Sequence, residues 1–358
     1  MELLPVDSDA EWACLLDAQA DATLFHTMPW LRFQERQFGF RLFPLVAWRD
    51  GQAMGVFPLF VTRRGLFRVS ASPRGIDMLI LGPLVAPEFL GELLDAYEDW
   101  ARSRGIDHTS IAFTKEIDPA VAERHGYVCQ RQRNGIVDLR GGTEAVYGRL
   151  APECRRRVRR AEALGVRIVE GDLTPYLDRY LHLSAEVFAR SGLKTPLTRG
   201  ILSAMLEALR DAGCLLSIRA EAEGQVTGMW FGGHYNGRFQ ALNTVSDRSF
   251  AKYSMNNLMN WHAIRWCCQR GLRQFDFGGA NIKSLAVFKG SFGAALSPYS
   301  NLVKTHSRLA RAVVRIMDMT AHRFRAMRFR SSRQGRLQPG AHPHLEPQPA
   351  EPGPDGEG

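Results

Sequence analysis

The strongest constraint on the fold of this chain is an order of helix and strand patterns that occurs twice. Apolar residues recur at helical spacing over 88–105, and short apolar runs at 77–85, 108–113 and 135–139 are typical of strands. The second half repeats this order, with a helix predicted over 155–164, a strand after it, two more helices, three strands over 214–246, a helix over 255–271 and a strand over 273–278. Such alternation predicts two successive α/β (α+β) units.

Three dipeptides predict tight turns between neighbouring strands. They are Asp50-Gly51, Glu223-Gly224 and Asn236-Gly237, each flanked by strand-like runs. Dipeptides of this kind favour the two-residue turns of antiparallel hairpins. Because strands separated by a helix usually pair in parallel, the sheets are predicted to be mixed.

Length and charge suggest how the units are arranged. A chain of 358 residues fits two domains, which we place at 1–140 and 141–305. Residues 306–330 are predicted to form a basic amphipathic helix, and 331–358, rich in Pro and Gly, a disordered tail. The net charge of +9 is uneven, because acidic residues outnumber basic ones before residue 141 and the reverse holds after it. An anionic partner is therefore expected at the second half.

Several classes of protein are excluded by missing patterns. No apolar run reaches the length of a membrane-spanning helix, and the acidic start does not resemble a signal peptide, so the chain is predicted to be cytoplasmic. The six cysteines include no C-x-x-C pair, and there is no H-E-x-x-H, G-x-S-x-G or P-loop motif. The sequence thus predicts no metal, and chemistry that depends on positioning and charge stabilisation.

An arginine-rich run over 153–168 raises the question of an anionic ligand. On a helix, Cys154, Val158 and Ala161 share an apolar face, and the cationic side chains form neighbouring columns. Columns of like charge cost stability when unpaired, which suggests that an anion offsets them. The ligand could be nucleic acid or a phosphate-bearing substrate, and a solvated helix face is the structural alternative. The arginines proposed to bind substrate are Arg155, Arg156, Arg159 and Arg160, with Arg157 at their edge.

The segment 247–257 could bind phosphate, because it leaves a strand and opens a helix. Ser254 is predicted as the N-cap, with Asn256 and Asn257 in the first turn and Arg248 and Lys252 beside it. A helix N-terminus offers free N–H groups and partial positive charge to an anion. The alternative is an ordinary capped helix with two solvated cations.

A second candidate site lies at 275–293. Asp276 is predicted at the end of a strand, followed by Gly278 and Gly279, which allow a sharp turn or a close approach to a ligand. Phe288 and Lys289 could place an aromatic face and an ammonium group near a developing negative charge. The structural alternative is a Gly-rich turn with core phenylalanines and a surface lysine.

Residues 253–280 and 288–293, with the arginine-rich run, resemble the C-terminal half of the FemAB-like family, and 25–33 and 55–73 resemble its N-terminal half. The resemblance implies two tandem GNAT-like (acyl-CoA N-acyltransferase) units. Phe288 and Lys289 match the family's Phe-Lys pair near the acyl donor, and Asp276 and Gly278 match its D-x-G strand end. One departure is Gly279-Ala280, where exosortase-associated relatives usually carry Arg-Ser.

The function implied is an N-acyltransferase that moves an acyl or aminoacyl group to an amine of a cell-envelope or polysaccharide precursor. The co-substrate would be acyl-CoA or aminoacyl-tRNA, and the acceptor a small-molecule or lipid-linked amine. Lys289 is expected to stabilise charge. Arg248, Lys252 and the amides of 256–257 would bind the donor phosphates. Tyr235 would supply a proton.

Three further hypotheses compete with this interpretation or extend it. One is an aminoacyl-tRNA-dependent transferase that builds peptidoglycan bridges, which makes tRNA a partner. Another, of a different class, is a non-catalytic phosphate- or nucleic-acid-binding protein that uses the arginine helix. The third places residues 307–330 peripherally on the inner membrane face, with arginines on anionic lipid; a docked C-terminal helix is the alternative.

Overall fold

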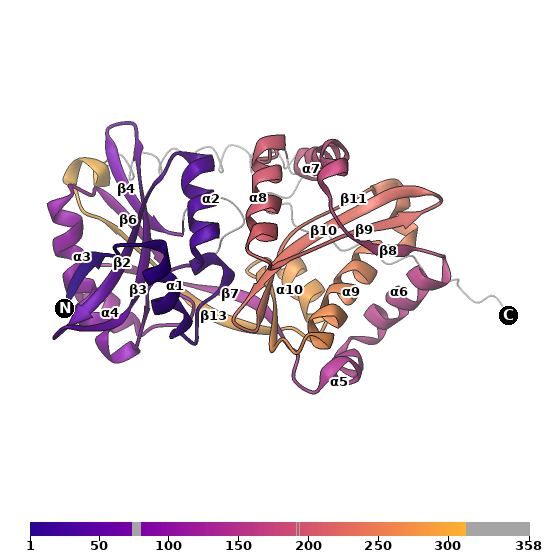
Figure 1. The fold of residues 1–358 in the computed structure, drawn as a ribbon, viewed down its shortest axis with the longest axis horizontal. Coiled ribbons are helices and arrows are strands. Elements are labelled where there is room, and N and C mark those ends of the chain that lie inside the picture. The colour runs from indigo at the N-terminus through magenta and orange to yellow at the C-terminus, as the bar shows by residue number, and fades with distance from the viewer. Residues whose placement is uncertain (74–79, 191, 193, 313–358) are drawn as a thin grey trace, which may run out of the picture.

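The computed structural model describes residues 1–73, 80–190, 192 and 194–312. Residues 313–358, which include most of the predicted basic helix and the whole predicted tail, lie outside the described residues. Within the described residues, the chain alternates helices and strands in both halves, which confirms the predicted α/β class with mixed pairing (Figure 1).

The strands belong to one 13-stranded sheet. Its order is β1-β2-β3-β4-β6-β13-β7-β12-β11-β10-β9-β8, with β5 paired to β3. In chain order the strands are β1 (Glu2–Pro5), β2 (Arg41–Arg49), β3 (Gln52–Arg64), β4 (Phe67–Ser72), β5 (Leu84–Val85), β6 (His108–Ala112), β7 (Val128–Asp138), β8 (Arg167–Glu170), β9 (Leu215–Ala222), β10 (Gln225–Tyr235), β11 (Arg238–Ser246), β12 (Gln274–Gly279) and β13 (Ala295–Thr305).

The helices cover both faces of this sheet (Figure 1). The α-helices are α1 (Asp9–Asp17), α2 (Met28–Phe38), α3 (Leu90–Ser103), α4 (Pro119–Arg124), α5 (Gly142–Arg149), α6 (Pro152–Ala163), α7 (Leu177–Arg190), α8 (Arg199–Asp211), α9 (Met255–Gln269) and α10 (Lys283–Gly290). Short 3₁₀ helices are η1 (Leu24–His26), η2 (Pro87–Phe89), η3 (Thr174–Tyr176) and η4 (Arg248–Tyr253).

All three predicted turns are present. Asp50-Gly51 joins β2 to β3, Glu223-Gly224 joins β9 to β10, and Asn236-Gly237 joins β10 to β11, with positive φ at both residues of each pair. The prediction of a strand over 77–85 is wrong for its described part, where only Leu84–Val85 pairs with β3. Instead β4, which the sequence pattern missed, lies parallel to β6.

Two long strands join the halves of the chain. β13 follows the last helix of the second half, yet its C-terminal part pairs with β6 and its N-terminal part with β7. β7 in turn pairs with β12 of the second half. The two units therefore share a continuous sheet, which holds their relative positions through backbone hydrogen bonds.

Three apolar clusters stabilise the sheet. One lies under α3, and a second packs α9 and α6 against the second half. The third draws on both halves, since Trp30 of α2, Leu209 of α8 and Phe231 of β10 are all within it. Because α2 and α8 pack against each other over this shared core, the junction between the units is a buried apolar contact.

Candidate active site

The parallel strands β11 and β12 part from each other soon after they meet. They pair only from Arg238↔Gln274 to Gln240↔Asp276, although β11 continues to Ser246 and β12 to Gly279. A V-shaped opening therefore begins at Gln240 and Asp276. Beyond this point the two strands no longer pair with each other, so their facing edges are not joined by the ladder of hydrogen bonds that holds the rest of the sheet.

A β-bulge in β11 gives this opening two differently lined faces. Gly232 pairs with Ala241 and Phe231 with Asn243, so Leu242 is an extra residue that shifts the alternation of side chains. Thr244 consequently lies opposite Trp230, on the face that α9 covers. Gln240 lies on the other face. Without the bulge, these two side chains would share one face.

Buried polar atoms without partners gather around the opening. Both amide atoms of Gln240, Oγ1 of Thr244, Oδ1 of Asn256 and Oδ1 of Asn134 have no hydrogen-bond partner within the described residues. Gln240 is only 2% exposed. Each unsatisfied buried group costs about 1–3 kcal/mol, and native chains carry few of them. Because Gln240 and Thr244 both belong to the strand that parts from β12, the opening is a candidate ligand site that sequence patterns did not reveal.

The first turn of α9 lies on the face of the sheet that α9 covers, on the same side as Thr244. Ser254 occupies the predicted N-cap position, but it adopts a left-handed conformation (φ 51°) and its side chain makes no capping hydrogen bond. The Ser254 hydroxyl therefore does not cap α9, and the partial positive charge of the first turn of this helix is available to an anion. Asn256 belongs to this turn, whereas the Asn257 amide turns toward α6 and contacts Cys154 Sγ at 3.6 Å.

The two basic residues beside this turn lie on η4. Lys252 Nζ is 3.7 Å from a Glu223 carboxylate oxygen and 5.0 Å from the centre of the Tyr253 ring. Arg248 is exposed. Both cations thus lie on the segment that leads into α9, as the sequence predicts, and Lys252 shares its charge with an acidic neighbour.

The structure brings Asp276, Gly278, Gly279 and Lys289 together at the end of β12. Asp276 Oδ1 accepts a hydrogen bond from the Gly278 N–H at 2.7 Å, and Gly278 has φ 73°, which favours glycine. Lys289 Nζ donates to the carbonyl oxygens of Phe277 at 2.8 Å and Gly279 at 2.5 Å. With two of its three N–H donors engaged, the ammonium holds the strand end and keeps one donor.

Burial sets the electrostatics of this pair. Lys289 is 5% exposed, and burial lowers the pKa of its ammonium to about 8, although Asp276 acts in the opposite direction. Burial likewise raises the pKa of Asp276, against the effect of the Arg238 and Lys289 charges. The lysine stem lies along Gly135 of β7, where an added Cβ would be 3.1 Å from Lys289 Cβ. Phe288 does not enter this cluster and packs on Phe292, with ring centres 5.3 Å apart.

The arginine-rich helix α6 packs beside α9 through its predicted apolar face. Cys154, Val158 and Ala161 are all buried. Part of the charge of this helix is offset within the chain, because Glu153 bonds both Arg156 and Arg157 at 2.7 Å.

Arg155, the first arginine of this helix, donates to the Gly148 carbonyl at 2.9 Å. Arg159 and Arg160 remain exposed and make no ion pair within the described residues. The cationic charge that remains available to an anion is therefore concentrated at these two side chains, toward the C-terminal end of α6.

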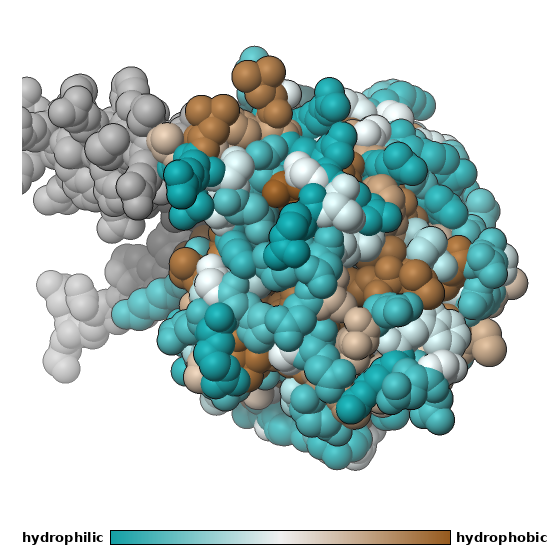
Figure 2. All heavy atoms as spheres, turned by 90° about the vertical axis from the view of Figure 1, so that its left-hand side faces the viewer, coloured by the Kyte–Doolittle hydropathy of each residue, from teal (hydrophilic) through white to brown (hydrophobic). Residues whose placement is uncertain are grey.

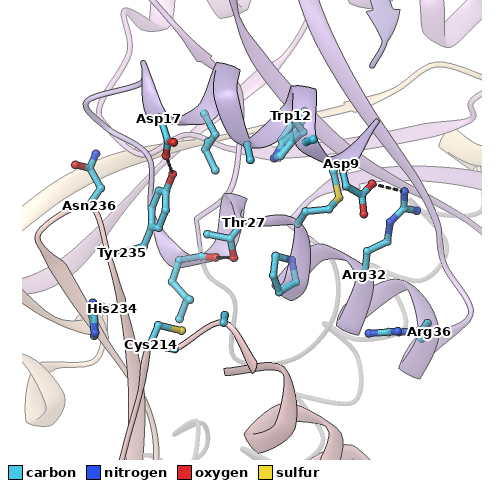
Figure 3. Close-up of a pocket in the computed structure, with 18 residues that line it drawn as sticks. Asp9, Trp12, Asp17, Thr27, Arg32, Arg36, Cys214, His234, Tyr235 and Asn236 are labelled. Carbon is cyan, nitrogen blue, oxygen red and sulfur yellow. Dashed lines mark hydrogen bonds and ion pairs between the residues drawn. The ribbon is translucent and has the colours of Figure 1, made fainter. Parts of the chain in front are cut away.

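Tyr235 lies away from the Lys289 cluster, at a cavity of about 910 Å³ between α1, α2 and the β10–β11 turn (Figure 3). Its hydroxyl donates to Asp17 Oδ1 at 2.7 Å; burial and this carboxylate raise the pKa of Tyr235. Figure 3 shows Arg32 and Arg36 across the cavity from Tyr235. Arg32 is paired with Asp9 at 2.9 Å.

The cavity and the opening lie on one face of the sheet. Tyr235 pairs directly with Arg238, which is two residues before Gln240 on β11, so these side chains point the same way. The distance along the strand from Arg238 to Gln240 is roughly 7 Å, at about 3.3 Å per residue. The walls of the cavity are mostly apolar, with Trp12, Leu24 and Met28 among them. An acceptor in the cavity could therefore extend toward the fork at Gln240.

Comparison with known proteins agrees with this geometry. Residues 149–289 match the acetyltransferase (GNAT) domain family, a range that contains β11, α9, β12 and nearly all of α10. No curated protein matches the chain. Among the described residues, no helix is long and apolar enough to cross a bilayer, and no group of three or more His, Cys, Asp or Glu side chains could hold a metal.

Solved structures extend the similarity to both halves. FemX superposes with a TM-score of 0.69 at 14% identity, covering 84% of this chain and 97% of FemX. L-PGS from Bacillus licheniformis gives 0.55 at 12% identity, covering 87% and 96%. A tandem GNAT protein from the clavulanic acid biosynthesis pathway gives 0.53 at 14% identity, covering 85% and 98%.

The family match shows an acetyltransferase (GNAT) domain over residues 149–289, and the superpositions show the tandem GNAT fold over most of the chain. More narrowly, the chain superposes on nearly the whole of FemX and so has the same fold as FemX, in agreement with the resemblance seen in the sequence. The strands that part at Gln240, the turn that enters α9 and the Asp276–Lys289 cluster all belong to the matched segment.

Proposed function

We propose that the chain transfers an acyl or aminoacyl group from acyl-CoA or aminoacyl-tRNA to an amine of a cell-envelope or polysaccharide precursor. The parting of β11 and β12, with unpartnered buried polar atoms on both of its faces, carries the proposal. Similarity to the C-terminal domain of a putative lysylphosphatidylglycerol synthetase from Agrobacterium fabrum (TM-score 0.53, 15% identity) supports aminoacyl transfer to a lipid-linked acceptor as one form of this reaction.

In this proposal, the acyl-CoA or aminoacyl-tRNA donor binds on the α9 side of the opening. Its phosphates would meet the first turn of α9, Arg248 and Lys252, and the exposed Arg159 and Arg160 of α6 would add charge for a larger anion such as tRNA. The reactive carbonyl would then reach the fork at Gln240. The acceptor amine would approach from the cavity at Tyr235, on the opposite face.

In the transfer, the amine nitrogen forms a bond to the carbonyl carbon while the C–S bond of a thioester, or the C–O bond of an aminoacyl ester, breaks. One amine proton leaves, and the departing thiolate or alkoxide gains one. Gln240 has an amide N–H to donate to the carbonyl oxygen and an amide oxygen to orient the amine. Lys289 is proposed to stabilise charge through its remaining N–H, and Tyr235 to relay a proton with Asp17.

The replacement Gln240→Leu tests this placement. It removes two unpartnered buried polar atoms at similar volume, so we expect unfolding free energy to stay level or rise by about 1 kcal/mol. Turnover should nevertheless fall about 10²-fold, as for loss of one carbonyl-oxygen donor. Thiol release from acyl-CoA and deacylation of aminoacyl-tRNA, each with a panel of amines, measure turnover and tell the two donors apart.

Gln225→Leu, an exposed glutamine at the start of β10, is the matched control and should keep full turnover. Normal turnover of Gln240→Leu together with a loss of stability would show that Gln240 is an ordinary structural residue. If neither donor is consumed with any amine, the proposed function is wrong, and steep salt-dependent binding of generic RNA would favour the nucleic-acid-binding alternative.

A further inference from the structure

A second concave site lies on the first half, far along the sheet from the parted strands. It is a cavity of about 560 Å³ next to the β3–β4 hairpin and the C-terminal end of α3. Its lining contains four arginines and no acidic side chain, the other residues being Gly39, Phe43, Val61 and Thr62. The arginines are Arg41, Arg63, Arg68 and Arg104.

The four cations have no anionic partner within the described residues. Arg63 and Arg68 are directly opposite each other on β3 and β4, an arrangement that like charges make unfavourable. Arg41 and Arg104 both lie over the ring of Phe43, at 4.9 and 5.7 Å from its centre. The nearby Asp107 carboxylate accepts from the backbone N–H of Arg68 and makes no ion pair with it. Like charges held together in this way are suited to bind an anion from outside.

An exposed apolar tip adjoins the four-arginine cavity. The hairpin turn between β3 and β4 presents Leu66, which is 92% exposed, with Arg64 next to it. An isolated leucine at a hairpin tip cannot gain from burial within the chain, but it can enter an apolar phase. Arginines around an apolar tip are the combination that binds an anionic lipid surface, where the charges meet phosphate and the tip meets acyl chains.

The segment that follows β13 carries a further exposed leucine and two exposed arginines at the same end of the sheet. Val69 of β4 pairs with His108 of β6, and Thr305 of β13 pairs with the same residue, so the start of β4 and the end of β13 are neighbours there. The short helical segment 308–312 follows, with Leu309 63% exposed between exposed Arg308 and Arg311.

The figures show both features at one end of the molecule. The 308–312 segment lies beside α3 at the end where the β3–β4 hairpin projects (Figure 1). Figure 2 faces this end and shows apolar side chains projecting from its upper rim among hydrophilic ones. Leu66, Leu309, Arg41 and Arg63 are exposed, whereas Arg68 and Arg104 are partly buried in the wall of the cavity.

We propose that this end of the first half docks on an anionic phospholipid membrane, with the four-arginine cavity binding a lipid phosphate and Leu66 entering the apolar layer. The inference does not depend on the acyltransferase proposal, because it concerns binding alone. It also differs from the hypothesis for residues 307–330, because the groups proposed to bind phosphate and enter the apolar layer lie on β2, β3, β4, the β3–β4 turn and the C-cap of α3, and segment 308–312 only adjoins them.

Sedimentation of the full chain with vesicles tests the proposal. Vesicles of equal parts phosphatidylcholine and phosphatidylglycerol should bind the chain, and pure phosphatidylcholine should not. Binding should weaken as salt rises, because counterions screen the arginines. Each arginine near such a surface contributes roughly five-fold to partitioning, so Arg63→Gln with Arg68→Gln should reduce binding roughly 25-fold. Leu66→Ser should reduce it at least about five-fold.

Matched controls come from elsewhere on the surface. Arg190→Gln on α7 and Leu4→Ser on β1 remove an exposed arginine and a 47%-exposed leucine, and both should bind as the unchanged chain does. The double arginine variant removes a cross-strand pair of like charges but also the hydrogen bond from the Arg68 guanidinium to the Arg104 carbonyl, so its thermal unfolding is measured beside the parent's to separate lost binding from unfolding.

Two results would overturn the proposal. Vesicle binding that survives both the arginine and the Leu66 replacements would assign the membrane contact to another part of the chain. The second result is that vesicles of neither composition sediment the parent, while inorganic phosphate, titrated by calorimetry, binds the parent and not the double arginine variant. That result would assign the cavity to a soluble phosphate-bearing ligand.

Discussion

Replacing Lys289 by Met should change how the stability of this chain depends on pH. The ammonium is buried against the carbonyls of Phe277 and Gly279, and burial lowers its pKa from 10.5 to about 8. The unfolded chain therefore binds this proton more tightly than the folded chain. Between about pH 8 and 10.5 the unfolded state holds more protons, so stability contributed by this group rises with pH.

The size of the effect follows from the shift. At 1.36 kcal/mol per pKa unit, keeping Lys289 charged in its buried site costs about 3 kcal/mol at neutral pH. That cost is fully present below about pH 8 and is relieved as the folded chain loses the proton. Integrated from about pH 7 to 9.5, the relief is about 2 kcal/mol.

Urea unfolding of the parent and of Lys289→Met across this pH range measures the effect. Other groups that titrate there are common to both chains, so the difference between the two unfolding free energies isolates Lys289. This difference should move by about 2 kcal/mol in favour of the parent as pH rises. Lys283→Met, an exposed lysine of the same helix, shows what loss of a surface charge does alone.

A difference that stays constant within about 0.5 kcal/mol, or moves the other way, would refute the reasoning that burial governs this lysine. The same variant should also lower turnover at least about 10²-fold if the remaining N–H acts on the reacting carbonyl. Normal turnover with the predicted pH effect would leave Lys289 a structural residue that holds the end of β12.

Two further predictions concern stability alone. Gly232→Ala should destabilise the chain by at least about 2 kcal/mol, because an added Cβ would lie 2.4 Å from a β11 backbone oxygen and from the Phe239 ring. Gly148→Ala is the control, because an added Cβ there would have nothing within 4 Å, and it should be neutral or stabilising. Equal effects of the two replacements in thermal unfolding would contradict this prediction. Burial alone would raise the pKa of Glu98, but hydrogen bonds, of which that from His306 is the largest, lower this pKa to about 2. The unfolded chain therefore binds the Glu98 proton more tightly, and about 2 kcal/mol of folding stability should be lost as pH falls from about 6 to 3. Urea unfolding of Glu98→Gln, compared with the parent over that range, should lack this loss; an identical acid response would count against the pairing.

Local patterns predicted much of the fold because they depend on neighbours in sequence. The period of apolar residues indicated α3, α6 and α9, and the three two-residue turns were recognisable from their dipeptides. β4 was missed although its residues 67–72 alternate apolar and polar side chains, because the polar positions Ser70 and Ser72 are also buried, and the partner β6 is distant in sequence. The strand expected at 77–85 shows that an apolar run alone does not fix pairing.

The candidate site divides in the same way. Asp276, Gly278 and Lys289 could be singled out by residue type, spacing and resemblance, and the structure places them in contact. Gln240 carries no signal in its sequence neighbourhood. Gln240 stands out because β11 parts from β12 at this residue and because its side-chain amide has no hydrogen-bond partner within the described residues. Both are properties of the assembled sheet.

The sequence by itself determined the α/β class, the hairpins, the amphipathic character of α6 and the residue types available for acyl transfer. Only the tertiary structure decided that Lys289 is buried on backbone carbonyls and that four arginines surround one cavity. The physical reason is that periodicity specifies which face of an element is apolar. Charge pairing, desolvation and strand separation depend instead on which elements meet, and those meetings join residues far apart in the chain.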